Sequence, residues 1–135
     1  VVEAELENMI ATYDVRKIGV DPHPAQARDI KRWIDRGWPI VTVDQSIRTM
    51  APAWKCWADL LKSRQLTYNN DPVLVSGLNQ ITLISDNVGN IRPVKGRGGK
   101  GNMDVIVSGN MAALLMEHHQ VREATGLSTS NCPIG

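Results

Sequence analysis

Two aspartates stand at positions where the chain could hold a divalent metal ion. Asp21 ends a short apolar run, residues 17–21, that Pro22 halts, and Asp104 opens the last helical stretch. Mg²⁺ and Mn²⁺ prefer carboxylate oxygens, and a pair of such ions can activate water and stabilise the leaving oxygen of a phosphodiester. The structural alternatives are a turn-forming Asp before proline and an Asp that complements a helix dipole.

Basic residues gather shortly before Asp104. No acidic residue lies between Asp86 and Asp104, and this interval holds four cations: Arg92, Lys95, Arg97 and Lys100. Positive charge beside carboxylates suits a polyanionic substrate, because each neutralised phosphate releases counterions. The pattern favours binding of a polyanionic partner, and the alternative is a solvated loop whose charges bind nothing.

The same segment is rich in glycine. Gly96, Gly98 and Gly101 fit the pattern G-x-G-x-x-G of dinucleotide-binding loops. That fingerprint should open a βαβ unit, whereas no strand is expected after the helix that follows here, and no Walker A sequence occurs. We therefore interpret the glycines as a flexible loop, and an α/β nucleotide-binding protein stays as an alternative function.

The elements that must position these residues begin with a βαβ unit. Apolar spacing predicts a helix over 1–13, a strand over 17–21, a helix from Pro24 to Gly37 and a strand over 40–44. Strands joined in this way run parallel, and ligands of such sheets lie beyond the carboxyl ends of the strands. Asp21 and Asp44 both occupy that edge, so Asp44 is a third candidate carboxylate.

The second half of the chain reads as helices around a hairpin. We expect a helix over about 49–64 with Thr49 as its N-cap, and Trp54 and Trp57 on its inner side. The remaining expected elements are a chain break at residues 69–72, hairpin strands at 79–84 and 90–95, and a last helix over 102–117. The predicted fold class is α/β.

Composition limits the possible functions. The chain has 135 residues, 42% hydrophobic and 21% charged, which suits one soluble domain, expected over 1–120, with a flexible polar tail over 121–135. Fifteen Lys and Arg against fourteen Asp and Glu give no global field that attracts nucleic acid or membrane, so such binding needs a local patch. No apolar run is long enough for a membrane span. Two cysteines, Cys56 and Cys132, do not make a disulfide framework or a zinc site.

Several short segments, in their order and spacing, resemble one known family. They are Gly19-Val20-Asp21-Pro22, Val43-Asp44-Gln45, Asn70-Asp71-Pro72-Val73-Leu74, Asn79, Gly89-Asn90-Ile91-Arg92-Pro93-Val94-Lys95 and Asn102-Met103-Asp104. Together they resemble the C-terminal nuclease domain of the large terminase subunit of tailed bacteriophages. The resemblance runs from about Lys17 to Glu117.

The resemblance implies an RNase H-like fold that cuts concatemeric viral DNA during genome packaging with Mg²⁺ or Mn²⁺. By position, Asp21 is similar to the middle catalytic aspartate and Asp104 to the last, and Lys95 matches a basic position before it. The resemblance further implies that the basic residues of the 92–100 loop, Arg92, Lys95, Arg97 and Lys100, contact the DNA backbone. The implied partners are double-stranded DNA and, in the parent protein, an ATPase domain, the small terminase subunit and the portal. The implied location is the cytoplasm of the infected bacterium.

The resemblance also implies what this chain lacks. In the family the first catalytic aspartate lies on a strand that precedes the helix expected at residues 1–13, so the chain is expected to hold an RNase H-like fold truncated at its N-terminus. Two functions follow: a metal-dependent DNA endonuclease domain, or a non-catalytic fragment that only binds DNA or a packaging partner. The truncated sheet would have an exposed edge at which a second copy could pair.

Overall fold

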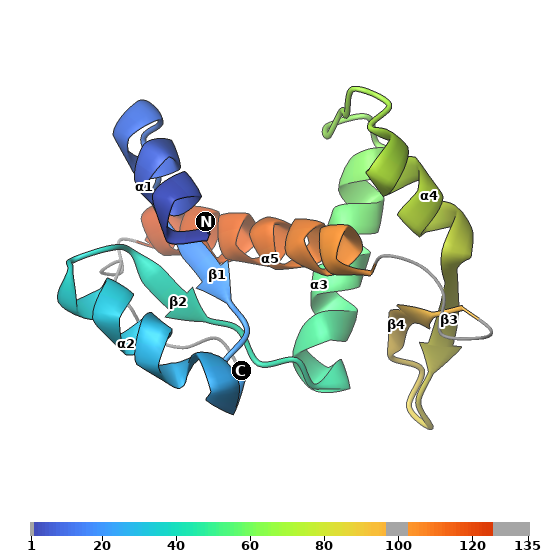
Figure 1. The fold of residues 1–135 in the computed structure, drawn as a ribbon. Helices are drawn as coiled ribbons and strands as arrows, with labels where there is room; N and C mark the ends of the chain where they lie inside the picture. The colour runs from blue at the N-terminus through green and yellow to red at the C-terminus, as the bar shows by residue number, and fades with distance from the viewer. Residues whose placement is uncertain (1, 97–102, 126–135) are drawn as a thin grey trace.

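The computed structural model describes residues 2–96 and 103–125, and the side chains of residues 121–125 are not described. Figure 1 shows the order of the elements along the chain. They are α1 (Val2–Thr12), β1 (Ile18–Val20), the 3₁₀ turn η1 (Pro24–Gln26), α2 (Ala27–Asp35), β2 (Ile40–Thr42), α3 (Ile47–Lys62), α4 (Pro72–Gln80), β3 (Ile81–Ser85), β4 (Ile91–Lys95) and α5 (Asp104–Thr125).

The first half of the chain forms a layered βαβ unit. β1 and β2 pair in parallel, with Ile18 opposite Ile40 and Val20 opposite Thr42. Because side chains alternate along a strand, one sheet face packs on Trp33 of α2, and the other carries Val41 against α5. The sheet therefore lies between α2 and α5.

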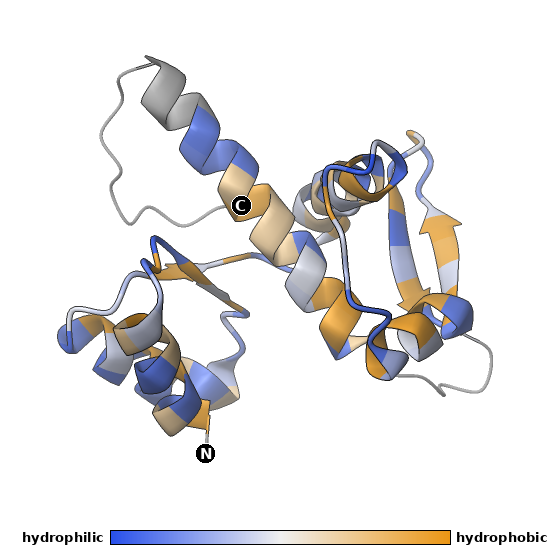
Figure 2. Cartoon of the chain, turned by 90° about the horizontal axis from the view of Figure 1, so that it is seen from above, coloured by the Kyte–Doolittle hydropathy of each residue, from blue (hydrophilic) through white to orange (hydrophobic). Residues whose placement is uncertain are grey.

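α5 joins this unit to the second half of the molecule. In Figure 1 it runs across the molecule from the α3, α4 and hairpin side to the β1 and β2 side. Figure 2 shows apolar residues in α5 where it passes α3, and polar residues toward its C-terminal end. Ile106 of α5 is fully buried against Trp57 of α3, and Leu74 of α4 packs on the same cluster. Both halves of the molecule thus pack against α5.

Most of the predicted elements are confirmed. The parallel strand pair and its connecting helix lie where the spacing placed them, and β3 and β4 form the antiparallel hairpin, with Leu83 opposite Pro93. The hairpin turn is fixed by Asp86, whose Oδ1 accepts hydrogen bonds from Val88 N and Asn90 N, each at 2.9 Å. The α/β class is therefore confirmed.

Three details of the predicted elements are wrong. α3 begins after Ser46, so Thr49 is not its N-cap but a buried residue of its first turn. The break at residues 69–72 is a helix start: Asp71 Oδ1 accepts from Val73 N at 2.9 Å and Leu74 N at 3.1 Å and caps α4, which was not predicted. The last helix continues beyond residue 117 to Thr125. Residues 126–135 of the expected tail lie outside the described residues.

Candidate functional site

Asp21 lies at the carboxyl end of the parallel strand pair. The last ladder hydrogen bond runs from Val43 N to Val20 O at 2.8 Å, and Asp21 follows directly as an exposed residue. Ligands of open α/β sheets occupy this edge. The local fold therefore presents the Asp21 carboxylate at the expected place.

Asp44 follows β2 at the same edge, and its carboxylate forms hydrogen bonds with residues at the start of α3. Its Oδ2 accepts hydrogen bonds from the Ser46 hydroxyl, from Ser46 N at 3.3 Å and from Thr49 Oγ1 at 3.2 Å. These bonds, above all that of the Ser46 hydroxyl, hold the pKa of Asp44 below its usual value. One oxygen of the carboxylate is thus committed to positioning α3.

Asp104 is the first residue of α5 and is exposed. Two residues later, Ile106 is completely buried, so the first turn of α5 is anchored in the core. A carboxylate at a helix N-terminus interacts favourably with the helix dipole. Asp104 is therefore a helix-end residue in this structure, and its role as a metal ligand stays a prediction.

The packing of α5 places Gly19, two residues before Asp21, against the middle of that helix. The α-carbon of Gly19 faces Met111 and Leu115, since a Cβ there would lie 3.5 Å and 2.9 Å from their side chains. Met111 is seven residues after Asp104, which is roughly 10 Å along a helix axis. Among residues 2–96 and 103–120, no three His, Cys, Asp or Glu side chains lie close enough together to hold a metal ion. The described residues thus offer two carboxylates and no complete ligand set.

Of the four predicted DNA-binding residues, two lie in the described chain. Arg92 and Lys95 both belong to β4, and Arg97 and Lys100 lie outside the described residues. Three positions apart on a strand, Arg92 and Lys95 point to opposite faces of the hairpin. Lys95 is exposed, whereas Arg92 is half-buried and its Nε has no hydrogen-bond partner among the described atoms.

The glycine pattern has a packing explanation at its first position. A Cβ on Gly96 would lie 2.2 Å from the carbonyl oxygen of Gln80, so the backbone of β4 passes too close to the end of α4 for any other residue. Gly98 and Gly101 lie outside the described residues. The close approach of the two backbones therefore explains why residue 96 is glycine, and this explanation needs no bound nucleotide.

Trp54 and Trp57 of α3 are part of the core, as the sequence predicts, and Cys56 packs beside them. Trp57 is 4% exposed, and the Trp54 and Trp57 rings lie 5.8 Å apart. Burial raises the pKa of the Cys56 thiol, which keeps it in the unreactive neutral form. These residues hold α3 against α5.

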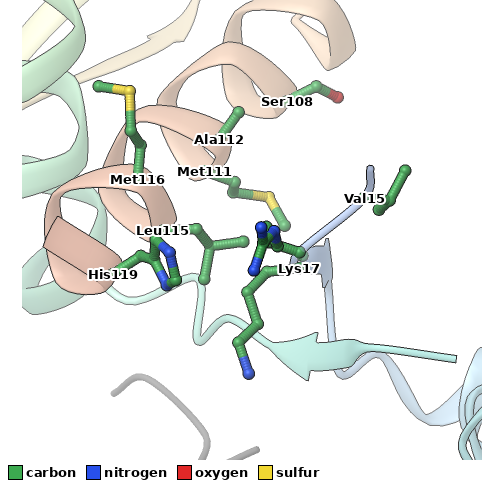
Figure 3. A pocket seen from close by; sticks show the side chains of 10 residues that line it. Val15, Lys17, Ser108, Met111, Ala112, Leu115, Met116 and His119 are labelled. Carbon is green, nitrogen blue, oxygen red and sulfur yellow. The ribbon is translucent and has the colours of Figure 1, made fainter. Parts of the chain in front are cut away.

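A groove between β1 and α5 was not predicted. Figure 3 shows Val15 and Lys17 on one side and the side chains of α5 on the other. The α5 side is a stripe of exposed residues four apart, Ser108, Ala112 and Met116. The spacing of these three residues is visible in the sequence, but a methionine at this spacing would be interpreted as part of a core face.

Taken together, the fold defines an α/β domain with acidic residues at the carboxyl ends of a parallel strand pair and a basic hairpin. The chain belongs to the family of terminase large subunit endonuclease domains, whose family model matches residues 2–120. No helix of the described chain is long and apolar enough to cross a bilayer.

The chain is also similar in fold to a solved phage protein, the large terminase of bacteriophage HK97. The two share 21% sequence identity with a TM-score of 0.71, and the match covers 84% of this chain and 24% of that one. The chain thus corresponds to about a quarter of the length of that terminase. No curated protein matches the sequence.

Proposed function

We propose that residues 1–120 form an RNase H-like nuclease unit of a phage large terminase that hydrolyses double-stranded DNA during genome packaging. The family match over residues 2–120 carries this proposal, and the exposure of Asp21 at the strand end and of Asp104 at the start of α5 supports it. The chain would act in the cytoplasm of the infected host, beside an ATPase domain, the small terminase subunit and the portal.

Asp21 and Asp104 are the residues that would hold Mg²⁺ or Mn²⁺. Their donor chemistry fits, because such ions are commonly held by one or two carboxylates together with water and phosphate oxygens. The metal would supply an activated water and charge stabilisation at the phosphodiester. Further ligands must come from water, from DNA or from residues beyond those described.

Lys95 is the exposed described residue that would contact the DNA backbone, together with Arg97 and Lys100, whereas Arg92 lies on the other face of the hairpin. Each phosphate contact contributes a salt-dependent share of the affinity. Replacing Lys95 by Ala should lower DNA affinity equally for unrelated sequences and reduce the salt slope by about 1. Lys31→Ala is the matched control, because Lys31 is an exposed lysine that pairs with Asp35 on α2.

The metal site is tested by titrating Mn²⁺ into the folded chain and measuring binding by calorimetry. Asp21→Asn and Asp104→Asn should each weaken the binding. Asp35→Asn should leave it unchanged, because Asp35 ends α2 and so lies near the amino end of β2, opposite Asp21. Equal losses in all three variants, or no saturable binding, would remove the metal assignment.

The second candidate function is a fragment that binds DNA or a packaging partner without cutting. The observation that favours it is the absence of a three-ligand group among the described residues. DNA binding that needs Lys95 but is unaffected by Mn²⁺ and by Asp104→Asn would support this candidate.

A further inference from the structure

The cations of α2 differ in whether a carboxylate neutralises them. Three of them lie within 2.7 Å of a carboxylate oxygen of α1 or α2: Lys31, Arg32 and the C-cap residue Arg36. The fourth, Arg28, is exposed, and no acidic side chain in residues 2–96 and 103–120 lies within ion-pair distance of it. The positive charge of α2 that is left to act on a ligand therefore lies in the first turn of the helix.

The first turn of α2 lies beside Asp21. Figure 1 shows the chain passing from the end of β1 directly to the start of α2. His23 is two residues after Asp21, so their α-carbons are at most about 7 Å apart. The Cα–Cβ bonds of a helix tilt toward its N-terminus, so the Arg28 side chain extends back toward His23. His23 and Arg28 are both exposed at the edge of the sheet where Asp21 lies.

One ring nitrogen of His23 is used by the fold, and the other is not. His23 is the N-cap of η1, and its Nδ1 accepts a hydrogen bond from Ala25 N at 3.2 Å. A ring nitrogen that accepts carries no proton, so Nε2 of this neutral imidazole is a donor. Serine, threonine, aspartate and asparagine are the preferred N-cap residues, so capping alone does not explain a histidine here.

The main chain at the start of α2 is already bonded within the turn. Ala25 N donates to His23 Nδ1, and Gln26 N donates to His23 O at 2.9 Å. Ala27 N donates to Pro24 O. The first N–H groups of a helix commonly bind phosphate, but these three have partners in the turn itself. An anion at this place would therefore be bound by side chains.

We propose that Arg28 and His23 bind a phosphate of the DNA strand that lies at Asp21. This inference rests on the proposed nuclease function, and it adds a contact on the α2 side to the one proposed for Lys95. The Arg28 guanidinium supplies charge and a planar set of donors that suits phosphate, and Nε2 of His23 supplies a neutral donor. Both are positioning residues, which hold the DNA backbone beside Asp21.

The Arg28 contact is tested by fluorescence anisotropy of a labelled DNA duplex in EDTA, over a range of salt concentrations. Each phosphate contact by a cation adds about 0.9 to the slope of log K against log salt concentration. Arg28→Ala should therefore lower the slope by about 0.9 and the affinity by about five- to tenfold at 0.1 M salt. Arg28→Lys should keep most of the slope, because lysine also binds phosphate. Lys31→Ala is the matched control on the same helix, because Lys31 is paired with Asp35.

The variant His23→Ser separates phosphate binding from helix capping. Serine is a preferred N-cap residue, so urea unfolding should be unchanged. Loss of the Nε2 donor should lower DNA affinity by about two- to tenfold. Because this donor is neutral, the salt slope should stay as in the wild-type chain. If His23→Ser binds DNA like the wild-type chain, or loses affinity only as far as it unfolds, the contact by His23 is refuted.

The remaining outcomes separate this inference from the proposed function. If Arg28→Ala binds DNA as tightly as the wild-type chain while Lys95→Ala binds more weakly, the inference is wrong and the proposed function stands. Equal losses in Arg28→Ala and Lys31→Ala would show an effect of overall charge and would contradict a direct contact. A folded wild-type chain that binds no duplex would overturn both.

Discussion

Replacing Gly109 by Ala tests how closely α5 approaches α3. A Cβ at this position would lie 2.9 Å from Nε1 and 3.2 Å from Cε2 of Trp57, an indole that is 4% exposed. Glycine inside a helix costs about 1 kcal/mol relative to alanine, so propensity alone predicts a gain. Overpacking a rigid core side chain costs about 1–3 kcal/mol, and the indole cannot turn away as a flexible chain end would. We therefore expect a net loss of about 1 kcal/mol in the free energy of unfolding.

The assay is thermal and urea unfolding followed by circular dichroism. A loss of about 1 kcal/mol lowers the Tm of a domain of this size by roughly 2–6 °C. Ser108→Ala is the matched control, because Ser108 is the neighbouring exposed residue and gains propensity without a clash. In a Trp57→Phe background, the Gly109→Ala change should lower the free energy of unfolding by less than it does in the wild-type chain. A gain in stability as large as that of Ser108→Ala would refute the close approach of the two helices, and with it the anchoring of Asp104.

Three further predictions concern other parts of the molecule. Asp71→Ala should destabilise the chain by about 0.5–2 kcal/mol in urea unfolding, because it removes the N-cap of α4, and Asp71→Asn should retain most of that stability. Gly96→Ala should loosen the hairpin and speed amide exchange in β4, because its Cβ would meet the carbonyl oxygen of Gln80 at 2.2 Å; unchanged exchange would contradict that contact. Hydrogen bonds from Arg32, the largest cause, lower the pKa of Glu3 below its usual 4.5. The contact of α1 with α2 should therefore be intact above pH 4.5 and should weaken as the pH falls through the lowered pKa of Glu3. Tryptophan fluorescence would report this change. If tryptophan fluorescence of Glu3→Gln changes with pH as in the wild-type chain, the Glu3 carboxylate is not the cause of the acid sensitivity.

Much of the fold was predictable because local signals agreed with the tertiary packing. The run at 17–21 and the run at 40–44 form the parallel pair, since β-branched residues there are also the ones that α2 and α5 cover. α4 was missed because Asp71-Pro72 was interpreted only as a break. The same pair is an N-cap and a favoured first-turn residue, and Leu74 and Leu78 follow with helical spacing.

The candidate site was predictable as residue types and not as an arrangement. The positions of Asp21 and Asp104 follow from strand and helix ends, which short patterns reveal. Their relative placement depends on where β1 crosses α5, and Gly19 packs beside Met111. No local pattern encodes this long-range register. In the same way, the sequence does not reveal that one oxygen of Asp44 bonds to the start of α3.

The central claim is that Asp21 and Asp104 support metal-dependent cutting of DNA. The most direct measurement is plasmid cleavage with Mn²⁺ by the wild-type chain and by Asp104→Asn, Asp21→Asn and the control Asp35→Asn, with folding checked by circular dichroism. The account predicts cutting by the wild-type chain and the control, and loss of cutting in the other two while they stay folded. A folded wild-type chain that leaves the plasmid intact, or an Asp104→Asn variant that still cuts, would contradict it.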